Sequence, residues 1–385
     1  MLETSTRYDA VIVGGRCAGA ATAIRLASAG LRVLVVERAA HATDTLSTHA
    51  LMRPAIVQLK RLGVLDALHA SGAAPIRSTT FYYGERQLEL AVKPGHGTDA
   101  LYAPRRFVLD ALLIDAARAA GAEVRHGTAL LDLLLDEQGR VRGAVVGGAE
   151  GTQTVASDLV IGADGRKSSV AQRVGAPIVR RARHASAFVY GYYAALPLEG
   201  YHWFYRPGSA AGSVATHDGQ CCVFAALPAR ADGRLPEPLA RDFEAALAAT
   251  SALLGEHVMR ARRQGPLRTF AGRPGYLRKA AGQGWALVGD ASFFKEPLTS
   301  HGITAALRDA EFLARAVIAG GEEALAHYEA QRDALSIEQL EIGDAFASFS
   351  WSLDDAQALH LRLAETVRAE LKALCGAAGA VSRAA

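Results

Sequence analysis

The 385-residue sequence predicts an α/β fold, in which a Rossmann-like nucleotide-binding domain carries an inserted antiparallel-sheet domain and ends in helices. Three observations predict this fold. A strand, a glycine turn, a helix and a second strand follow one another from Tyr8 to Arg38. From Arg180 to Gly275 the sequence changes to short strand-like runs that are bounded by turn residues. From Glu322 onward it is helical.

The opening segment has the order and size of a parallel βαβ crossover, which needs about 30 residues. Asp9 to Val13 is an apolar run, typical of a strand that is buried on both faces. An amphipathic helix follows, and Gly30 is expected to end it. Leu31 to Val36 is a second buried strand, with Glu37 at its C-terminal end.

The turn after the first strand predicts a dinucleotide site. Gly14 permits the bend, Gly15 lets the backbone approach a phosphate, and Gly19 lets the helix pack against the strand. The helix N-terminus then offers N–H groups to a pyrophosphate, and Glu37 is placed to accept hydrogen bonds from a ribose. Arg16 replaces the second glycine of the G-x-G-x-x-G fingerprint. The alternative is an ordinary βα turn.

Composition and charge restrict the partners and the setting. With 42 basic and 39 acidic residues the net charge is +3, which argues neither for nucleic acid nor for an anionic membrane. No apolar run reaches the roughly 18 residues of a membrane span, and no signal peptide is recognisable, so we expect a cytoplasmic protein. No metal site is expected, because zinc and disulfide spacings are lacking at Cys17, Cys221, Cys222 and Cys375.

A polar loop, His41 to His49, follows the second strand. It leaves the C-terminal edge of a parallel strand, where open α/β sheets bind their ligands. Ser47, Thr48 and His49 are therefore candidates to line a cofactor or substrate pocket. The alternative is that Ser47 or Thr48 caps the next helix, Leu51 to Leu62.

A predicted hairpin, Thr79 to Val92, interrupts the alternation of strands and helices. The alternation resumes with a helix after Tyr102, which three short strands follow. Leu159 to Ile161 is a further buried strand, followed by a Gly-Ala-Asp-Gly turn with Asp164 at its tip. Asp164 either contacts a ligand or makes an Asx-type turn.

The segment from Arg180 to Gly275 predicts the antiparallel sheet. Asp218-Gly is a hairpin turn signal, and Leu239 to Leu253 is helical. Most of the aromatic side chains on these strands are expected in the core, and a few in the wall of an apolar substrate pocket. The candidates for that wall are Tyr193, Trp203 and Tyr205.

A third informative stretch begins at Gly284. Ala286 to Val288 is a strand with Gly289-Asp290 at its C-terminal end. Pro297 to Gly302 is a loop that leads into a helix, Ile303 to Ile318. The N–H groups at the start of that helix can face an anionic ring oxygen.

Together the three stretches resemble the FAD-dependent oxidoreductases of the para-hydroxybenzoate hydroxylase fold, a superfamily of class A flavin monooxygenases, geranylgeranyl reductases and flavin halogenases. The resemblance covers roughly residues 8 to 318. We expect a discontinuous FAD-binding domain, a substrate-binding β-sheet domain and C-terminal helices. The expected boundaries are 1–75, 100–180 and 276–320 for the first, 76–99 and 181–275 for the second, and 321–385 for the third.

The resemblance implies a role for each motif. The glycines of the first turn would hold the FAD pyrophosphate, Glu37 the adenosine ribose, and Asp290 the ribityl chain or pyrophosphate. His49 and His301 are the candidates for acid–base catalysis. The residues expected to contact FAD are Gly14, Gly15, Arg16, Cys17, Ala18, Gly19, Glu37, Arg38, Ser47, Thr48, Arg106, Asp164, Gly165, Gly289, Asp290, Pro297, His301, Gly302 and Ile303.

Departures from the family pattern concern the first and last motifs. Arg16 must point away from the pyrophosphate or contact a phosphate. Hydroxylases often read Pro-x-x-Gly-x-Gly-x-Asn, whereas Ser300 and Thr304 replace the first of these glycines and the asparagine here. Pro-x-x-Ser-x-Gly is similar to halogenases, which also need a lysine between flavin and substrate. Lys60 is available, but the polar face of its helix explains it.

The resemblance implies an FAD-dependent monooxygenase first. NADPH or NADH would reduce FAD as a transient electron donor, and O₂ would form a flavin C4a-hydroperoxide that oxygenates an apolar or aromatic small molecule. The alternatives are a double-bond reductase similar to geranylgeranyl reductases and a flavin-dependent halogenase, either of which can require a partner reductase. A flavin-binding protein without turnover is a further alternative.

Overall fold

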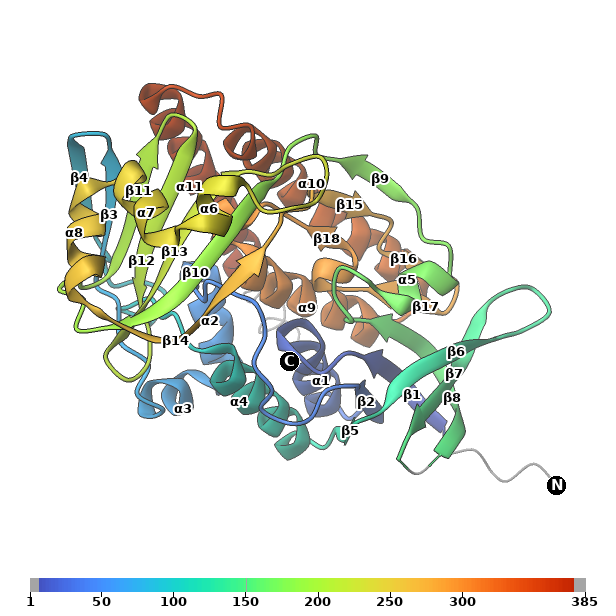
Figure 1. The fold of residues 1–385 in the computed structure, drawn as a ribbon. Coiled ribbons are helices and arrows are strands. Elements are labelled where there is room, and N and C mark those ends of the chain that lie inside the picture. The colour runs from blue at the N-terminus through green and yellow to red at the C-terminus, as the bar shows by residue number, and fades with distance from the viewer. Residues whose placement is uncertain (1–6, 150, 377–385) are drawn as a thin grey trace.

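The computed structural model describes residues 7–149 and 151–376. Two large sheets stand side by side, with helices between and around them (Figure 1). The helices are α1 Cys17–Ser28, α2 Arg53–Arg61, α3 Leu65–Ala70, α4 Arg106–Ala119, α5 Ser169–Arg173, α6 Glu237–Arg241, α7 Phe243–Thr250, α8 Ala252–Arg260, α9 Gly302–Ala319, α10 Gly321–Ala347 and α11 Leu353–Gly376, together with the 3-10 helices η1 Gly289–Ala291 and η2 Pro297–Thr299.

The first sheet has eight strands and a parallel core. The path runs β16-β17-β8-β1-β2-β5, and β6 and β7 form an antiparallel arm that extends β8. Strands β17, β8, β1, β2 and β5 pair with one another in parallel, which confirms the Rossmann-like prediction. The strands are β1 Arg7–Val13, β2 Val33–Glu37, β5 Glu123–His126, β6 Ala129–Leu135, β7 Val141–Gly148, β8 Gly151–Gly162, β16 Ala281–Gly282 and β17 Trp285–Leu287.

The second sheet has seven strands in the order β14-β10-β13-β12-β11-β3-β4. It is antiparallel except where β11 and β3 pair in parallel, so the predicted hairpin of β3 and β4 joins at one edge. The strands are β3 Ser78–Tyr83, β4 Arg86–Ala91, β10 Ser186–Ala194, β11 Tyr201–Arg206, β12 Ser209–Ala215, β13 Gln220–Pro228 and β14 Arg262–Phe270; a third sheet holds β9 Ile178–Arg181, β15 Tyr276–Arg278 and β18 Phe293–Phe294.

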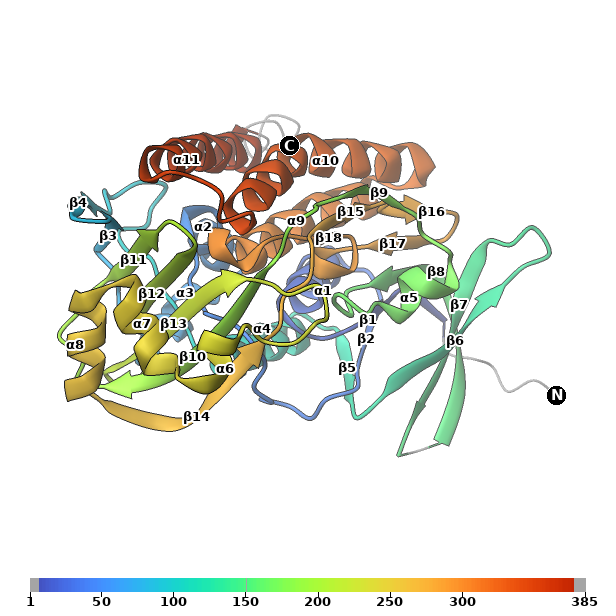
Figure 2. The ribbon, with the colours of Figure 1, turned by 45° about the horizontal axis from the view of Figure 1, so that its top comes forward.

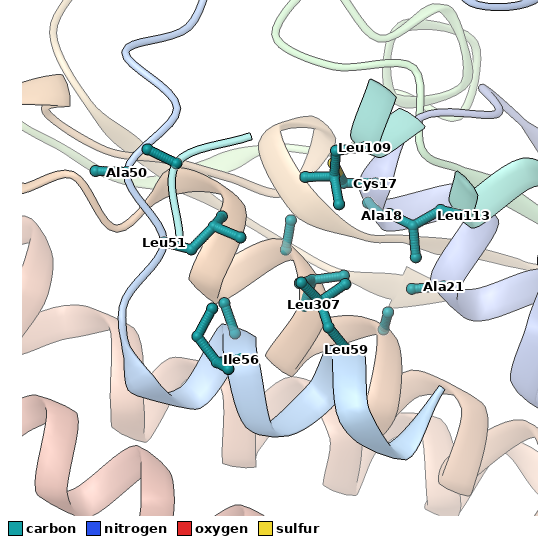
Figure 3. Packing of buried hydrophobic residues seen from close by; sticks show 14 of the residues in the cluster. Cys17, Ala18, Ala21, Ala50, Leu51, Ile56, Leu59, Leu109, Leu113 and Leu307 are labelled. Carbon is teal, nitrogen blue, oxygen red and sulfur yellow. The ribbon is translucent and has the colours of Figure 1, made fainter. Parts of the chain in front are cut away.

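Close packing around α1 requires glycine and small residues. A Cβ at Gly19 would lie 1.8 Å from the carbonyl oxygen of Gly14, so only glycine lets α1 approach the turn. Cys17, Ala18 and Ala21 of α1 then pack close to leucines of α4 and α9, including Leu307 (Figure 3). Gly30, with φ of 86°, ends α1 as predicted.

The two faces of the seven-stranded sheet meet different neighbours. Helices α6, α7 and α8 cover one face, where Val189 and Tyr193 of β10 are buried. The opposite, inner face carries Tyr190 and Tyr192 and packs toward α2, α4 and α9. The inner face is therefore the one that meets the loops of the parallel sheet.

Some elements were not predicted, for local reasons. The single helix expected over Leu239 to Leu253 is broken into α6, α7 and α8, because Asp242 and Ser251 leave helical geometry and each caps the next helix. Strand β14 contains Gly265 and Pro266 among charged residues, so it shows no clear alternation.

Helix α10 packs on α9, and α11 packs on α10 and α2 (Figure 2). Arg308 of α9 is completely buried and pairs with Glu370 of α11, while its Nη2 atom donates to Ser336 of α10 at 2.8 Å. The tail expected over Gly376 to Ala385 falls almost entirely outside the described residues. Within the described residues, none of the helices is both long enough and apolar enough to cross a membrane.

Candidate active site

The predicted motifs share one edge of the parallel sheet. Strands β1, β8 and β17 pair in parallel, so the segments that follow Val13, Gly162 and Leu287 leave at the same edge. The turn after β1 touches the turn after β8, because a Cβ at Gly14 would lie 2.4 Å from the carbonyl oxygen of Ala163. Three stretches far apart in sequence therefore line one site.

Glu37 lies at the end of β2 and holds the first turn. Its Oε2 atom accepts a hydrogen bond from the backbone N–H of Gly15 at 2.8 Å, and its Oε1 atom accepts one from Ala39 at 2.9 Å. Each carboxylate oxygen has capacity for a further donor, such as a ribose hydroxyl. Arg38, the next residue, is exposed.

The first turn of α1 is tied to α4 through a residue that sequence reasoning missed, Asp110. Its carboxylate accepts hydrogen bonds from Arg16, Cys17 and Arg106. Burial raises the pKa of the Cys17 thiol, which therefore stays protonated and serves packing. The signal that could have revealed Asp110 is its position four residues after Arg106 on the same helix face.

Asp164 makes the turn that the sequence left open, and one of its carboxylate oxygens stays unpaired in the part of the chain that the structure describes. Its Oδ2 atom accepts from the backbone N–H of Ser169 at 2.6 Å and from the Ser169 hydroxyl at 2.7 Å, so it makes a turn that precedes α5. Its Oδ1 atom is buried and has no partner among the described residues. Gly165 supports the turn with φ of 77°.

Asp290 follows β17, as predicted, and feels the charge of a buried lysine that was not predicted, Lys295. Burial raises the pKa of Asp290, and the charge of Lys295 is the largest of the effects that lower this pKa. Burial lowers the pKa of Lys295 to about 7, and its Nζ atom donates to the carbonyl oxygen of His301 at 3.4 Å. The buried Lys295 side chain thus contacts the residue that precedes α9.

The start of α9 is open on its outer side. Gly302 is exposed, and a Cβ at this position would meet no atom within 4 Å. Ser300, which stands where hydroxylases often have glycine, adopts a left-handed conformation with φ of 55°. His301 is buried, its Nδ1 atom contacts the Thr299 carbonyl, and its Nε2 atom has no described partner.

The loop after β2 reaches the inner face of the seven-stranded sheet. The backbone N–H of Ser47 donates to the Tyr190 hydroxyl at 3.1 Å, and the Ser47 hydroxyl accepts from the N–H of His49 at 3.0 Å. Neither Ser47 nor Thr48 caps α2, whose N-cap is Met52. The capping alternative for these residues is therefore wrong.

His49 is the most constrained residue of this loop. It is buried, it adopts φ of 70°, and its Nε2 atom lies 2.6 Å from the Tyr192 hydroxyl. Burial and the nearby Arg105 and Arg106 lower its pKa well below the usual value, so the imidazole is neutral. Its Nδ1 atom has no described partner. A strained, buried and incompletely paired histidine indicates a functional site.

Tyr192 is fixed from both sides. The Arg105 guanidinium lies 3.6 Å from the centroid of its ring, and the Arg105 Nη2 atom is 3.6 Å from Asp44. Burial raises the pKa of Tyr192, which keeps its hydroxyl protonated. Sequence reasoning selected its neighbour Tyr193 and missed Tyr192, although strand alternation places the two on opposite faces.

The three aromatic candidates are not brought together. Tyr193 faces α7, where its hydroxyl donates to Glu244 at 2.9 Å, so it lies away from the loops of the parallel sheet. Trp203 lies on the inner face and donates to Thr79 at 3.0 Å. Tyr205 also lies on that face, 3.0 Å from the Nε2 atom of His360, inside an aromatic cluster with α11.

The site has features that fit a flavin dinucleotide. Four buried polar atoms near the predicted cofactor residues have no described partner: Asp164 Oδ1, His49 Nδ1, His301 Nε2 and Arg105 Nε. A ligand with both donors and acceptors can satisfy them. The N-terminus of α1, a strand-end carboxylate and the open start of α9 suit pyrophosphate, ribose and an anionic ring respectively.

Comparisons with known proteins agree with this geometry. The sequence model of a family described as FAD binding domain matches residues 7–341. The chain is 27% identical to menaquinone reductase of Mycolicibacterium smegmatis over 338 residues, 82% of this chain and 78% of the relative. It is 31% identical to 6-methylpretetramide 4-monooxygenase of Streptomyces rimosus over 180 residues, which cover 45% of this chain and 42% of that protein.

The fold also matches solved structures. The crystal structure of p-nitrophenol 4-monooxygenase PnpA from Pseudomonas putida DLL-E4 superimposes with a TM-score of 0.78, at 18% identity. The match covers 96% of this chain and 98% of that protein. At this identity the likeness supports the para-hydroxybenzoate hydroxylase fold and not a shared substrate.

Proposed function

The chain belongs to the FAD binding domain family, and from that premise we propose that it is an FAD-dependent monooxygenase. It uses NADPH or NADH and O₂ to oxygenate an apolar or aromatic small molecule. FAD-dependent oxidoreductase chemistry follows from the family, and the choice of oxygenation is the proposal. The domain boundaries and the cofactor residues named above belong to the same proposal.

One observation carries the choice of oxygenation, namely the His49–Tyr192 pair at the edge of the aromatic inner face. A neutral imidazole with a free Nδ1 atom can exchange a hydrogen bond with a substrate hydroxyl. Accepting a hydrogen bond from that hydroxyl raises the electron density of a phenolic ring, which favours transfer of an oxygen atom to it. His49 is therefore the proposed acid–base residue, and His301 is proposed to lie beside the cofactor ring.

Bound FAD would supply the redox chemistry, by accepting a hydride and activating O₂. The chain supplies binding and charge. Glu37 would hold the ribose, Asp164 and Asp290 would orient the ribityl and pyrophosphate region, and the N–H groups at Gly302 would stabilise negative charge on the reduced ring. The inner face of the seven-stranded sheet would keep water from the reacting atoms.

A double-bond reductase is the second candidate, because the menaquinone reductase relative aligns over most of both chains. A halogenase is less well supported. The Nζ atom of Lys60 donates to the carbonyl of Gly97 at 2.6 Å, and Lys60 lines a surface hollow together with His96 and Cys375. These neighbours include none of the residues proposed to hold FAD, which argues against a role for Lys60 between flavin and substrate.

The experiment is an anaerobic absorption spectrum of the purified protein before and after NADPH or NADH, followed by O₂ and a panel of phenolic compounds. A monooxygenase gives a flavin spectrum that bleaches and a product that carries oxygen from O₂. Anaerobic saturation of a double bond would identify the reductase. Hydrogen peroxide without product would favour a protein that only binds flavin, and absence of flavin after soaking with FAD would reject the proposal.

A further inference from the structure

Beyond the roles that the motifs imply, we infer that Asp110 holds Arg16 and Arg106 together as a clamp for the FAD pyrophosphate. In this inference the side chain of Arg16, which stands where the fingerprint has its second glycine, binds a phosphate of FAD. The inference rests on the proposed FAD binding and names how this chain achieves it with an altered turn.

The first support is the number of donors on one carboxylate. Arg106 donates to Asp110 from Nε at 3.1 Å and from Nη2 at 2.9 and 3.0 Å. Arg16 donates from Nη1 at 2.9 Å, and the Cys17 thiol donates at 3.0 Å. The Asp110 side chain is only 9% exposed, so these bonds are made in a largely dry environment.

The second support is the charge balance. Two guanidinium groups and one carboxylate leave one net positive charge beside the N-terminus of α1, where a pyrophosphate is expected. An arginine has five N–H groups, and Asp110 engages only some of them. The Nε and Nη2 atoms of Arg16 and the Nη1 atom of Arg106 donate to no residue in the described part of the chain, so they are free for phosphate oxygens.

The third support is the place of Arg16 in the turn. Arg16 is the N-cap residue of α1, and its side chain makes no capping hydrogen bond. The side chain is 29% exposed, and its Nη1 atom also donates to the carbonyl of Thr43 at 3.3 Å. The clamp therefore joins α1 and α4 to the loop that carries His49, and its rotamer is fixed before a ligand arrives.

The test measures the dissociation constant of FAD with the full chain after removal of bound flavin. Arg16→Gly restores the glycine of the fingerprint, and Asp110→Asn removes the charge that holds both arginines. Asp115→Asn, on the exposed side of the same helix, is the matched control. Each variant is measured at about 0.01 M and about 1 M ionic strength, where the Debye length is about 30 Å and 3 Å.

We expect R16G and D110N each to weaken FAD binding about 10- to 100-fold at low ionic strength, the range for hydrogen bonds to charged groups. The double variant should bind FAD no more weakly than the single variant with the lower affinity, because both substitutions act on one clamp. The loss in R16G should shrink at high ionic strength, whereas a merely structural role would give a loss independent of salt. D115N should bind like the wild type.

FAD binding by R16G that equals the wild type at low ionic strength would overturn the clamp while leaving the proposed function intact. A loss that does not change with salt would also overturn it. Failure of the wild type itself to bind FAD would reject both. Should D110N unfold, R16G still tests the inference. This variant takes a partner only from Asp110, and Arg106 continues to pair with that carboxylate.

Discussion

The Nε2 atom of His49 lies 2.6 Å from the hydroxyl of Tyr192, although 143 residues separate them in the chain. This contact joins the loop after β2 to the inner face of the seven-stranded sheet. Both side chains are buried, and the histidine is neutral because burial and two arginines lower its pKa. The pair therefore lies where the cofactor loops and the aromatic face meet.

Replacement of Tyr192 by Phe tests this pair. The change removes the hydroxyl that positions His49 and keeps the ring under Arg105. We expect turnover of a phenolic substrate to fall about 100-fold, the lower range for general acid–base catalysis, while the affinity for FAD stays unchanged. Steady-state kinetics with oxygen consumption and product formation measured together would show the loss.

Tyr193→Phe is the matched control, because the neighbouring side chain faces α7 and donates to Glu244 at 2.9 Å. It should retain full turnover. Equal losses of turnover in the two variants would mean that neither hydroxyl acts in the site and that both effects come from the sheet.

A second prediction concerns Glu37→Gln. The amide keeps the shape of the side chain but loses one acceptor and the charge, so we expect FAD to bind about 10-fold more weakly. Titration of the flavin-free protein measures the change. Glu123→Gln, at the start of the adjacent β5 and bonded to Tyr8 at 2.5 Å, should leave FAD affinity unaltered. An unchanged affinity in E37Q would contradict a ribose role.

The fold was predictable because sequence patterns within short segments indicate its strands, helices and turns. The βαβ opening, the hairpin turn at Asp218 and Gly219, and the apolar strands each depend on neighbours within a few residues. Their meeting at one sheet edge follows from parallel pairing alone, since segments after parallel strands leave on the same side. The motifs could therefore be assigned to one site without knowing a tertiary contact.

The contacts that complete the site were not predictable in this way. Asp110 receives bonds from residues 93 and 94 positions away, and His49 meets Tyr192 only after the two sheets pack. The selection of Tyr193 shows the same limit, because alternation along β10 reveals that two faces differ but not which face meets the loops. Lys295 carried no signal beyond its proximity to Asp290.

A third prediction concerns the buried pair of Arg308 and Glu370. Glu370→Ala leaves the guanidinium of Arg308, completely buried, with Asp309 as its remaining carboxylate partner. We expect the free energy of unfolding to fall by about 3–5 kcal/mol, as measured by chemical denaturation. Glu338→Ala removes the exposed pair with Arg362 between α10 and α11 and should cost about 0–1 kcal/mol. Similar losses for both would show that burial of the pair is unimportant.

The last prediction concerns two consecutive buried residues with opposite pKa shifts. Burial raises the pKa of Glu296 from 4.5 to about 7, so the folded state binds its proton more tightly. The contribution of Glu296 to stability is therefore lost as the pH rises from 4.5 through about 7. Burial lowers the pKa of Lys295 from 10.5 to about 7, so the folded state binds that proton less tightly. The contribution of Lys295 is lost as the pH falls from 10.5 through about 7.

The two contributions therefore meet in a stability minimum near neutrality, which single variants should separate. Glu296→Gln keeps a neutral side chain beside Ser186 and should abolish the loss of stability between pH 4.5 and about 7. Lys295→Met should abolish the gain between about 7 and 10.5, because no ammonium group then has to lose its proton. The thermal midpoint of each variant minus that of the wild type, followed across pH, isolates each residue from the other titrating groups. A difference that stays constant across pH in both variants would contradict the shifts.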